Sequence, residues 1–593
     1  MRSAWVVLAT ALVALAAACT TEDGSPVTSD NDVAEEMADD RAPVLVKDPR
    51  TLVQLEEAGF SFSQVVTPAQ MKPITDTLTQ DLDLMKRQDP KAGVGVENPH
   101  RLFDKRWFAS KQTRFELVGV VNRLDRKTAG NCGEFRLIYR LAYTAQRTAS
   151  RLPMTVNVVF PQADDGKSCQ TVAQKWLDAK SGTADALSKG PLASLPKVGS
   201  IEVNLQSARW PSNERPEFGG HAEYILRVFK AEGETVAPIA LENTPRSNLD
   251  ATEVEELKKW VADNVAAIDD GSAVVPEKFL ASKAISIGPA GGARDANRPW
   301  TRLFPDAKAA FGSIPLAGTQ QVQSPAALLR RLDTMSCNGC HQTRSIAGFH
   351  LLGEERDPNA RANALAIGRS THFEGELAWR SDLLQATATG AAFTAPRPFA
   401  ERTVQAGNYG AHCGLGDPGF STWTCDEGLE CLDMHGDVVG YCSPSNAPVG
   451  DACETGKVTK NANPRLDGVT DLKQLGCNDG RGARCNPTSM GFPDGMCRLD
   501  CAPDKVGSIV EDTICGEIPS AAGLTQCLAA NKPFTECLAT TSAPAFLHTC
   551  DRTNPCRDDY ACARVRNGPP GIGACMPPYF AFQARVDGHL LDL

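Results

Sequence analysis

Six short stretches between residues 115 and 241 are rich in Val, Ile, Phe and Tyr and are separated by turn residues, which is typical of β-strands. They are 115–124, 133–144, 154–160, 200–206, 222–230 and 236–241. Residues 171–182 and 250–271 instead show a helical pattern, and the second has an acidic start and a glycine at its end. A mixed α+β domain over residues 45–315 is therefore predicted.

A second helical pattern runs through residues 316–400. Ser324-Pro325 is a favourable helix start, because serine caps a helix and proline fits its first turn. The stretch "AALLRRLDTM" follows directly, and "ANALAIGRS" (362–370) and "GELAWRSDLLQAT" (375–387) continue with helical character. These residues are predicted to form a small all-α segment.

Residues 401–593 have neither pattern and hold 16 of the 21 cysteines. Three stretches, beginning at Cys425, Cys477 and Cys556, share one order: a cysteine, a short acidic turn, a cysteine, a glycine-containing loop and Gly-x-Cys. They resemble the small cysteine-rich modules of extracellular proteins, in which cross-links replace a large core. Sixteen cysteines allow eight disulfides of unspecified connectivity. A zinc site is disfavoured, because CxxC pairs and suitably spaced histidines are absent from this region. The region is predicted to be irregular or β in structure.

The N-terminus predicts export. Arg2 precedes an apolar run from Ala4 to Ala18, which is too short to span a bilayer and is typical of a signal peptide. The run closes in "LAAAC", which resembles the lipobox of bacterial lipoproteins, and the resemblance implies a lipid anchor on Cys19. A plain signal peptide with an incidental Cys19 is the alternative. Residues 20–44 are polar and acidic and are predicted to be a disordered tether.

The net charge limits the classes of binding partner that are expected, and the cysteine content suggests disulfides. The net charge is −11, and no basic run stands out, so neither nucleic acid nor an anionic membrane surface is an expected partner. Export favours disulfides. Cys132 and Cys169 are the only cysteines in residues 45–315 and are predicted to pair, which would stabilise the domain by about 4 kcal/mol.

The most specific chemical motif is Cys337-Asn338-Gly339-Cys340-His341, at the end of the helix that starts after Ser324. Two cysteines two residues apart, followed by histidine, are typical of covalent haem attachment. The motif resembles that of c-type cytochromes. The resemblance implies one haem c held by thioethers from Cys337 and Cys340, with His341 as an axial ligand of the iron. The expected function is one-electron transfer to a redox partner protein.

A second axial ligand is less evident. No methionine lies between Met335 and Met434, and Met335 is too close to Cys337 to reach the far face of the ring. His350 is the first choice, and His372 is also available. Without either, five-coordinate iron would leave a face open for peroxide or oxygen chemistry.

Two other interpretations of the motif remain open. A redox-active CxxC of the thioredoxin-like kind is disfavoured, because the motif follows a helix and lies far along the chain from the predicted strands. A structural disulfide between Cys337 and Cys340 would make the chain a haem-free surface lipoprotein that binds through its cysteine-rich repeats. No catalytic constellation emerges in residues 45–315, so an enzymatic activity is left open. Attachment to the cell envelope is predicted, with the outer membrane or cell surface favoured over the inner membrane.

Overall fold

The structure is a computed structural model. It describes residues 44–90, 92–94, 98, 100–128, 130–145, 148–209, 221–285, 298–337, 365–366, 371–399, 407, 411–433 and 438–443, with the short stretches 484–486, 496–498, 530, 549–550, 561–564 and 573–576. These residues belong to one unit, Arg41–Leu593. Cys19 and the tether up to residue 43 lie outside the described residues.

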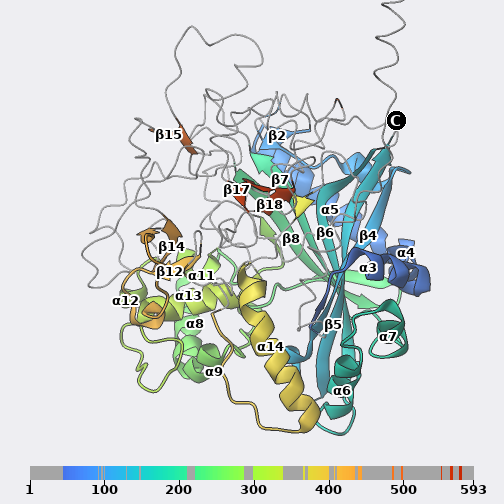
Figure 1. The fold of residues 1–593 in the computed structure, drawn as a ribbon. Helices are drawn as coiled ribbons and strands as arrows, with labels where there is room; N and C mark the ends of the chain where they lie inside the picture. Colours follow the sequence, from blue (N-terminus) through green and yellow to red (C-terminus); the bar gives the residue numbers. More distant parts are fainter. Residues whose placement is uncertain are drawn as a thin grey trace, which may run out of the picture. The chain divides into compact units, whose positions relative to one another are not determined.

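A ten-stranded sheet dominates the N-terminal half (Figure 1). Its strands are β1 Leu45–Val46, β2 Ala92–Gly93, β3 His100–Arg101, β4 Thr113–Arg123, β5 Asn131–Ala145, β6 Thr148–Ala163, β7 Ser200–Arg209, β8 His221–Glu232, β9 Thr235–Ile239 and β10 Ala284–Ile285. The path is β1-β4-β5-β6-β7-β3-β2, and β8 pairs with β7, β9 and β10. The pairs are antiparallel except for β2–β3.

The six predicted strands correspond to β4 to β9, and the mixed α+β class is confirmed. Strand β4 is buried continuously from Leu117 to Arg123. Both of its faces are therefore covered, which explains why its sequence is a continuous apolar run rather than an alternation.

Helices that the sequence analysis did not predict lie between β1 and β2. They are α3 Pro49–Leu55, the π-helix η2 Glu56–Phe60, α4 Phe62–Val65 and α5 Pro68–Gln88. Thr67 caps α5, with Gln70 completing a capping box and Pro68 in the first turn. The buried Ile74, Leu78, Leu82 and Met85 recur every three or four residues, so α5 buries one face.

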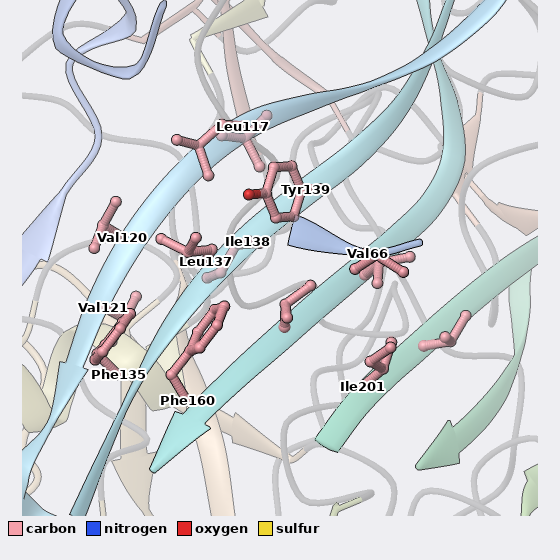
Figure 2. Packing of buried hydrophobic residues seen from close by; sticks show 14 of the residues in the cluster. Val66, Leu117, Val120, Val121, Phe135, Leu137, Ile138, Tyr139, Phe160 and Ile201 are labelled. Atoms are coloured by element: carbon pink, nitrogen blue, oxygen red, sulfur yellow. The ribbon is translucent and has the colours of Figure 1, made fainter. Parts of the chain in front are cut away.

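The first core lies between this sheet and its helices, which also include α6 Gln170–Asp178 and α7 Ala184–Lys189. In Figure 2, Leu117, Leu137 and Phe160 project from the neighbouring strands β4, β5 and β6. Phe135 stacks on Phe160 with ring centroids 4.9 Å apart. The buried Tyr139 hydroxyl donates a hydrogen bond to the Phe60 carbonyl at 2.6 Å, which satisfies its polar end.

A second core is built from helices. They are α8 Ala251–Asp263, α9 Val265–Asp270, α11 Pro299–Leu303, α12 Ala307–Phe311 and α13 Pro325–Met335. The predicted helix 250–271 is broken into α8 and α9 at Asn264, whose φ of −121° is not helical. Because α8 and α9 pack against α11 to α13, residues predicted to lie in one α+β domain contribute to two cores.

Helix α14, Thr371–Thr389, includes the predicted helical stretch 375–387. None of its described side chains contributes to the second core with α13. Its Leu377 and Leu384 belong to the first core. The prediction of a helix over 362–370 is wrong at Leu365–Ala366, which form strand β11. These two residues pair with β18 (Ala561–Arg564), so backbone pairing with a distant strand overrides the local helical pattern.

The cysteine-rich region contains small sheets. Strands β12 His412–Gly414, β13 Glu430–Asp433 and β14 Val439–Ser443 form one, and β15 Arg484–Asn486 pairs with β16 Met496–Arg498. Strands β17 Thr549–Cys550, β18 and β19 Gly573–Met576 form a four-stranded sheet with β11, in the order β11-β18-β19-β17. The first is cross-linked by Cys413–Cys431 and Cys425–Cys442.

A third disulfide joins Cys132 to Cys169, the pair expected from the sequence, with Cα atoms 5.4 Å apart. Disulfides of this kind are typical of an extracellular or periplasmic protein. Within the described ranges, no helix is long and apolar enough to cross a membrane.

Candidate functional site

The CxxCH motif begins where helix α13 ends. The C-cap of α13 is Ser336, and Cys337 follows it directly. Cys340, His341 and His350 lie outside the described residues, as does the side chain of His372, the first-turn residue of α14. Cys337 and helix α13 before it are therefore the part of the candidate site that the structure describes.

Helix α13 is capped as the sequence predicts and is buried on every side. The Ser324 hydroxyl accepts a hydrogen bond from the Ala327 N–H at 2.9 Å, and Pro325 occupies the first turn. Every residue from Ala326 to Thr334 is buried. Its polar side chains are therefore enclosed together with the apolar ones and need internal partners.

Arg331 finds these partners in backbone carbonyls. Its guanidinium donates hydrogen bonds to the carbonyls of Ile268, Asp269, Arg397 and Pro398, at 2.6–3.1 Å. Burial lowers the pKa of Arg331 to about 10, so the side chain is still protonated at neutral pH. The cation thus joins α13 to two chain segments more than 60 residues away in either direction.

Gly271 makes room for this cation. Its φ is +80°, and a Cβ at this position would lie 2.7 Å from Arg331 Nη2. A larger residue would therefore be strained by the backbone conformation and would also collide with the guanidinium.

Asp333 anchors the other side of α13. Its carboxylate accepts hydrogen bonds from the Trp300 N–H at 2.8 Å and from the Thr301 hydroxyl at 2.6 Å. The Trp300 indole in turn donates to the Asn243 carbonyl at 2.9 Å. Asn243, with a left-handed φ of 51°, donates to the Met335 carbonyl at 3.4 Å. These bonds fasten the end of α13 to the loop that follows β9.

Cys337 lies against that loop and against the large sheet. Its N–H donates to the Glu242 carbonyl and to the Thr244 hydroxyl, both at 3.1 Å. The half-buried Cys337 packs in a small apolar cluster formed by Leu226, Val228, Leu241 and Ala284. Strand β8 supplies the first two of these side chains, so the motif begins next to strands that are far from it in sequence.

Met335 faces a different environment from Cys337. It packs against the second core, among the side chains of the helices around α13, whereas Cys337 packs against β8.

A chain of ion pairs starts beside Cys337. Glu242, whose carbonyl binds the Cys337 N–H, accepts a hydrogen bond from Arg126 through its carboxylate. Arg126 also lies 3.5 Å from Glu134, which pairs with Arg136 at 2.7 Å. Burial lowers the pKa of Arg126, but the charges of Glu242 and Glu134 and the hydrogen bond to Glu242 together outweigh it and raise the pKa overall, so the guanidinium stays charged.

A second, more deeply buried set of ion pairs joins the sheet to α14. Asp125 binds Arg123 at 2.9 Å and lies 3.9 Å from Arg380, which pairs with Glu376. Glu376 also binds Arg397 at 2.8 Å. Burial raises the pKa of Asp125, but the charges of Arg123 and Arg380 outweigh it and hold that pKa well below its usual range.

These ion pairs were not predicted, although the stretch "NRLDRK" (122–127) contains a sequence signal for them. Alternating charges follow directly on the buried residues of β4, where the strand ends in the turn η4, Leu124–Arg126. Charges that directly continue a buried strand need partners, because an unpaired buried charge is costly.

Two clusters of possible metal ligands occur among the described residues. One is Cys413, Cys425 and Cys431, and the other is Cys132 with Asp164 and Asp165. All four cysteines are in disulfides, so their sulfur atoms are not available as thiolate ligands.

Comparison with known proteins adds no relative. No protein-family model matches the chain, and no match is found among curated proteins or solved structures. The function must be argued from the residues and their geometry.

Proposed function

We propose that this chain is an exported c-type haem protein of the cell envelope that carries single electrons. Cys337 and Cys340 would form the thioether links, and His341 would be an axial ligand. The observation that carries the proposal is the CxxCH sequence placed directly after a helix that buried hydrogen bonds hold on two sides.

The surroundings of Cys337 fit an apolar macrocycle. Leu226, Val228, Leu241 and Ala284 offer hydrocarbon contacts, and the Cys337 N–H is already satisfied by Glu242 and Thr244. A rigid attachment point next to apolar side chains would exclude water from one edge of the ring. Burial is one of the protein's means of setting a haem potential, and the apolar side chains beside Cys337 would supply it.

The chemistry would be divided between cofactor and protein. The haem iron, when bound, supplies the one-electron couple. Cys337 and Cys340 would hold the ring, and His341 would supply a nitrogen ligand to the iron. His350 is proposed as the second ligand, which would favour electron transfer over ligand binding at an open iron.

The first test is a pyridine haemochrome assay on protein exported from a host that matures c-type cytochromes. We expect a haem c signal that survives denaturation in the wild type and is absent from C337S/C340S. H341A should keep the thioether signal but change the visible spectrum of the native protein, and H350A should shift it further if His350 is a ligand. An unchanged native spectrum in H341A would contradict the axial assignment.

We also propose that Cys19 carries a lipid anchor. Metabolic labelling with a fatty acid should label the wild type but not C19A, and C19A should leave the membrane fraction. Labelling of both variants equally would remove Cys19 as the anchor without affecting the haem proposal.

A haem-free binding lipoprotein is the second candidate. It is favoured by the presence of two cysteine-rich sheets with the same strand order, β12-β14-β13 and β17-β19-β18. Absence of haem, together with a Cys337–Cys340 disulfide in a peptide map, would support this candidate over the cytochrome.

A further inference from the structure

Two parts of the cysteine-rich region share one backbone arrangement. In the first, β12 and β13 lie on either side of β14, and in the second, β17 and β18 lie on either side of β19. The registers coincide residue by residue. Cys413 lies opposite Gly440 as Cys550 lies opposite Gly573.

The other outer strand agrees as well. Cys431 lies opposite Cys442, and Cys562 lies opposite Cys575. In both sheets the central strand therefore carries a glycine two residues before its cysteine. A further cysteine precedes the second outer strand at the same distance in both, since Cys425 and Cys556 each stand six residues before the strand cysteine.

The disulfides of the first sheet follow from this arrangement. Residues paired across strands share a face, and so do residues two apart on one strand, so Cys413, Cys431, Gly440 and Cys442 share one face. Gly440 has no side chain, which leaves the face of the central strand open for the Cys413–Cys431 bond between the two outer strands. Cys442, although opposite Cys431, bonds Cys425 instead.

We infer that the second sheet has the same connectivity, with Cys550 bonded to Cys562 and Cys556 bonded to Cys575. Gly573 corresponds to Gly440 and leaves the same passage between the outer strands. Each bond forms when two thiols lose two protons and two electrons to a disulfide-bearing oxidant of the export compartment, by thiol–disulfide exchange. Cys556 is assigned to Cys575 because it stands six residues before Cys562, as Cys425 stands six residues before Cys431.

The bonds would also hold the chain that follows the CxxCH motif. Strand β11 pairs with β18, with Leu365 opposite Ala563 and Ala366 opposite Cys562. The last repeat thus includes two residues from the segment between the motif and α14. The Cys550–Cys562 bond would therefore stabilise the pairing of β11 with β18, whether or not the motif carries haem.

Peptide mapping under non-reducing conditions tests the connectivity directly. Arg552, Arg557 and Arg564 separate the four cysteines, and cleavage after Phe546 isolates Cys550 from the cysteines before it. Combined digestion of the intact exported protein with trypsin and chymotrypsin should yield one linked peptide pair with Cys550 and Cys562, and another with Cys556 and Cys575. The Cys413–Cys431 and Cys425–Cys442 pairs are the internal control. A Cys562–Cys575 linkage would overturn the inference.

Single substitutions provide a second measurement. C562S should expose one thiol to alkylation, and that thiol should be Cys550, whereas C575S should expose Cys556. Alkylation of Cys575 in C562S would contradict the inference, even if wild-type peptides were too complex to assign. C431S is the matched variant in the first sheet and should expose Cys413.

Discussion

Individual buried charges hold the candidate site in place. Arg331 and Asp333, two residues apart on α13, face different segments and are satisfied by different partners. A carboxylate or guanidinium without partners in such an interior would cost several kcal/mol. The bonds therefore dictate the orientation of the helix that leads into Cys337.

We expect D333N to lower the free energy of unfolding by about 2 kcal/mol, because an amide cannot replace the carboxylate toward both Trp300 and Thr301. Urea unfolding followed by tryptophan fluorescence would measure the change. D263N is the control, since Asp263 forms an exposed pair with Lys259, and its effect should stay below about 0.5 kcal/mol. Equal effects of the two substitutions would contradict the anchoring role of Asp333.

The lowered pKa of Asp125 predicts that the free energy of unfolding depends on pH in the acid range. Its pKa is lower in the folded than in the unfolded chain, so its contribution is complete above the unfolded value of about 4 and is lost as the pH falls through the folded value. D125N, which leaves Arg123 without its carboxylate, should cost about 3–5 kcal/mol at pH 7. The difference from wild type should shrink steadily as the pH is lowered from 4 to 2. A constant difference in urea unfolding across this range would contradict the lowered pKa.

At the scale of elements, α13 connects the candidate site to the cysteine-rich region. The Ser324 hydroxyl caps the helix and also donates to Asp417, which lies between Cys413 and Cys425 in the first disulfide-linked sheet region. One side chain therefore begins the helix and contacts this sheet region.

We expect S324A to destabilise the protein by about 1–2 kcal/mol, because the cap and the bond to Asp417 are both lost. T183A removes a comparable cap from α7, which contributes to the first core, and should cost about 1 kcal/mol. Amide hydrogen exchange should show faster exchange near Ser324 and Asp417 in S324A only. Unchanged exchange at residues 411–433 in S324A would show that the contact is not a stabilising one.

At the scale of the whole chain, the described residues build two main hydrophobic cores. Phe420, which lies between Cys413 and Cys425, is fully buried in the second core, 4.8 Å from the ring of Phe399. This disulfide-linked segment is therefore part of the same hydrophobic core as α13.

F420A should destabilise the second core by about 3–5 kcal/mol through the cavity it leaves. Hydrogen exchange should rise in α8 to α13 and in β12 to β14, and remain slow in β4 to β7. V274A is the control, because Val274 is 70% exposed, and it should change little. Faster exchange throughout the large sheet would instead show that the two cores unfold as one.

Local patterns were sufficient for several elements. The strands β4 to β9, the capped helix at Ser324 and the Cys132–Cys169 bond could be predicted because each depends on neighbouring residues or on a unique pair of cysteines. The helices between β1 and β2 were missed although their caps and apolar spacing are local. Residues 362–370 were misassigned at β11 because its pairing partner lies almost 200 residues away.

The sequence by itself determined the CxxCH motif, the apolar N-terminal run that predicts export and the repeated cysteine order, because spacing along the chain defines each of them. Only the tertiary structure decided that Cys337 meets β8, Glu242 and Thr244, and that Arg331 and Asp333 are enclosed. These neighbours come from segments far apart in sequence. Their meeting depends on how sheet and helices bury apolar surface together, which no local pattern specifies.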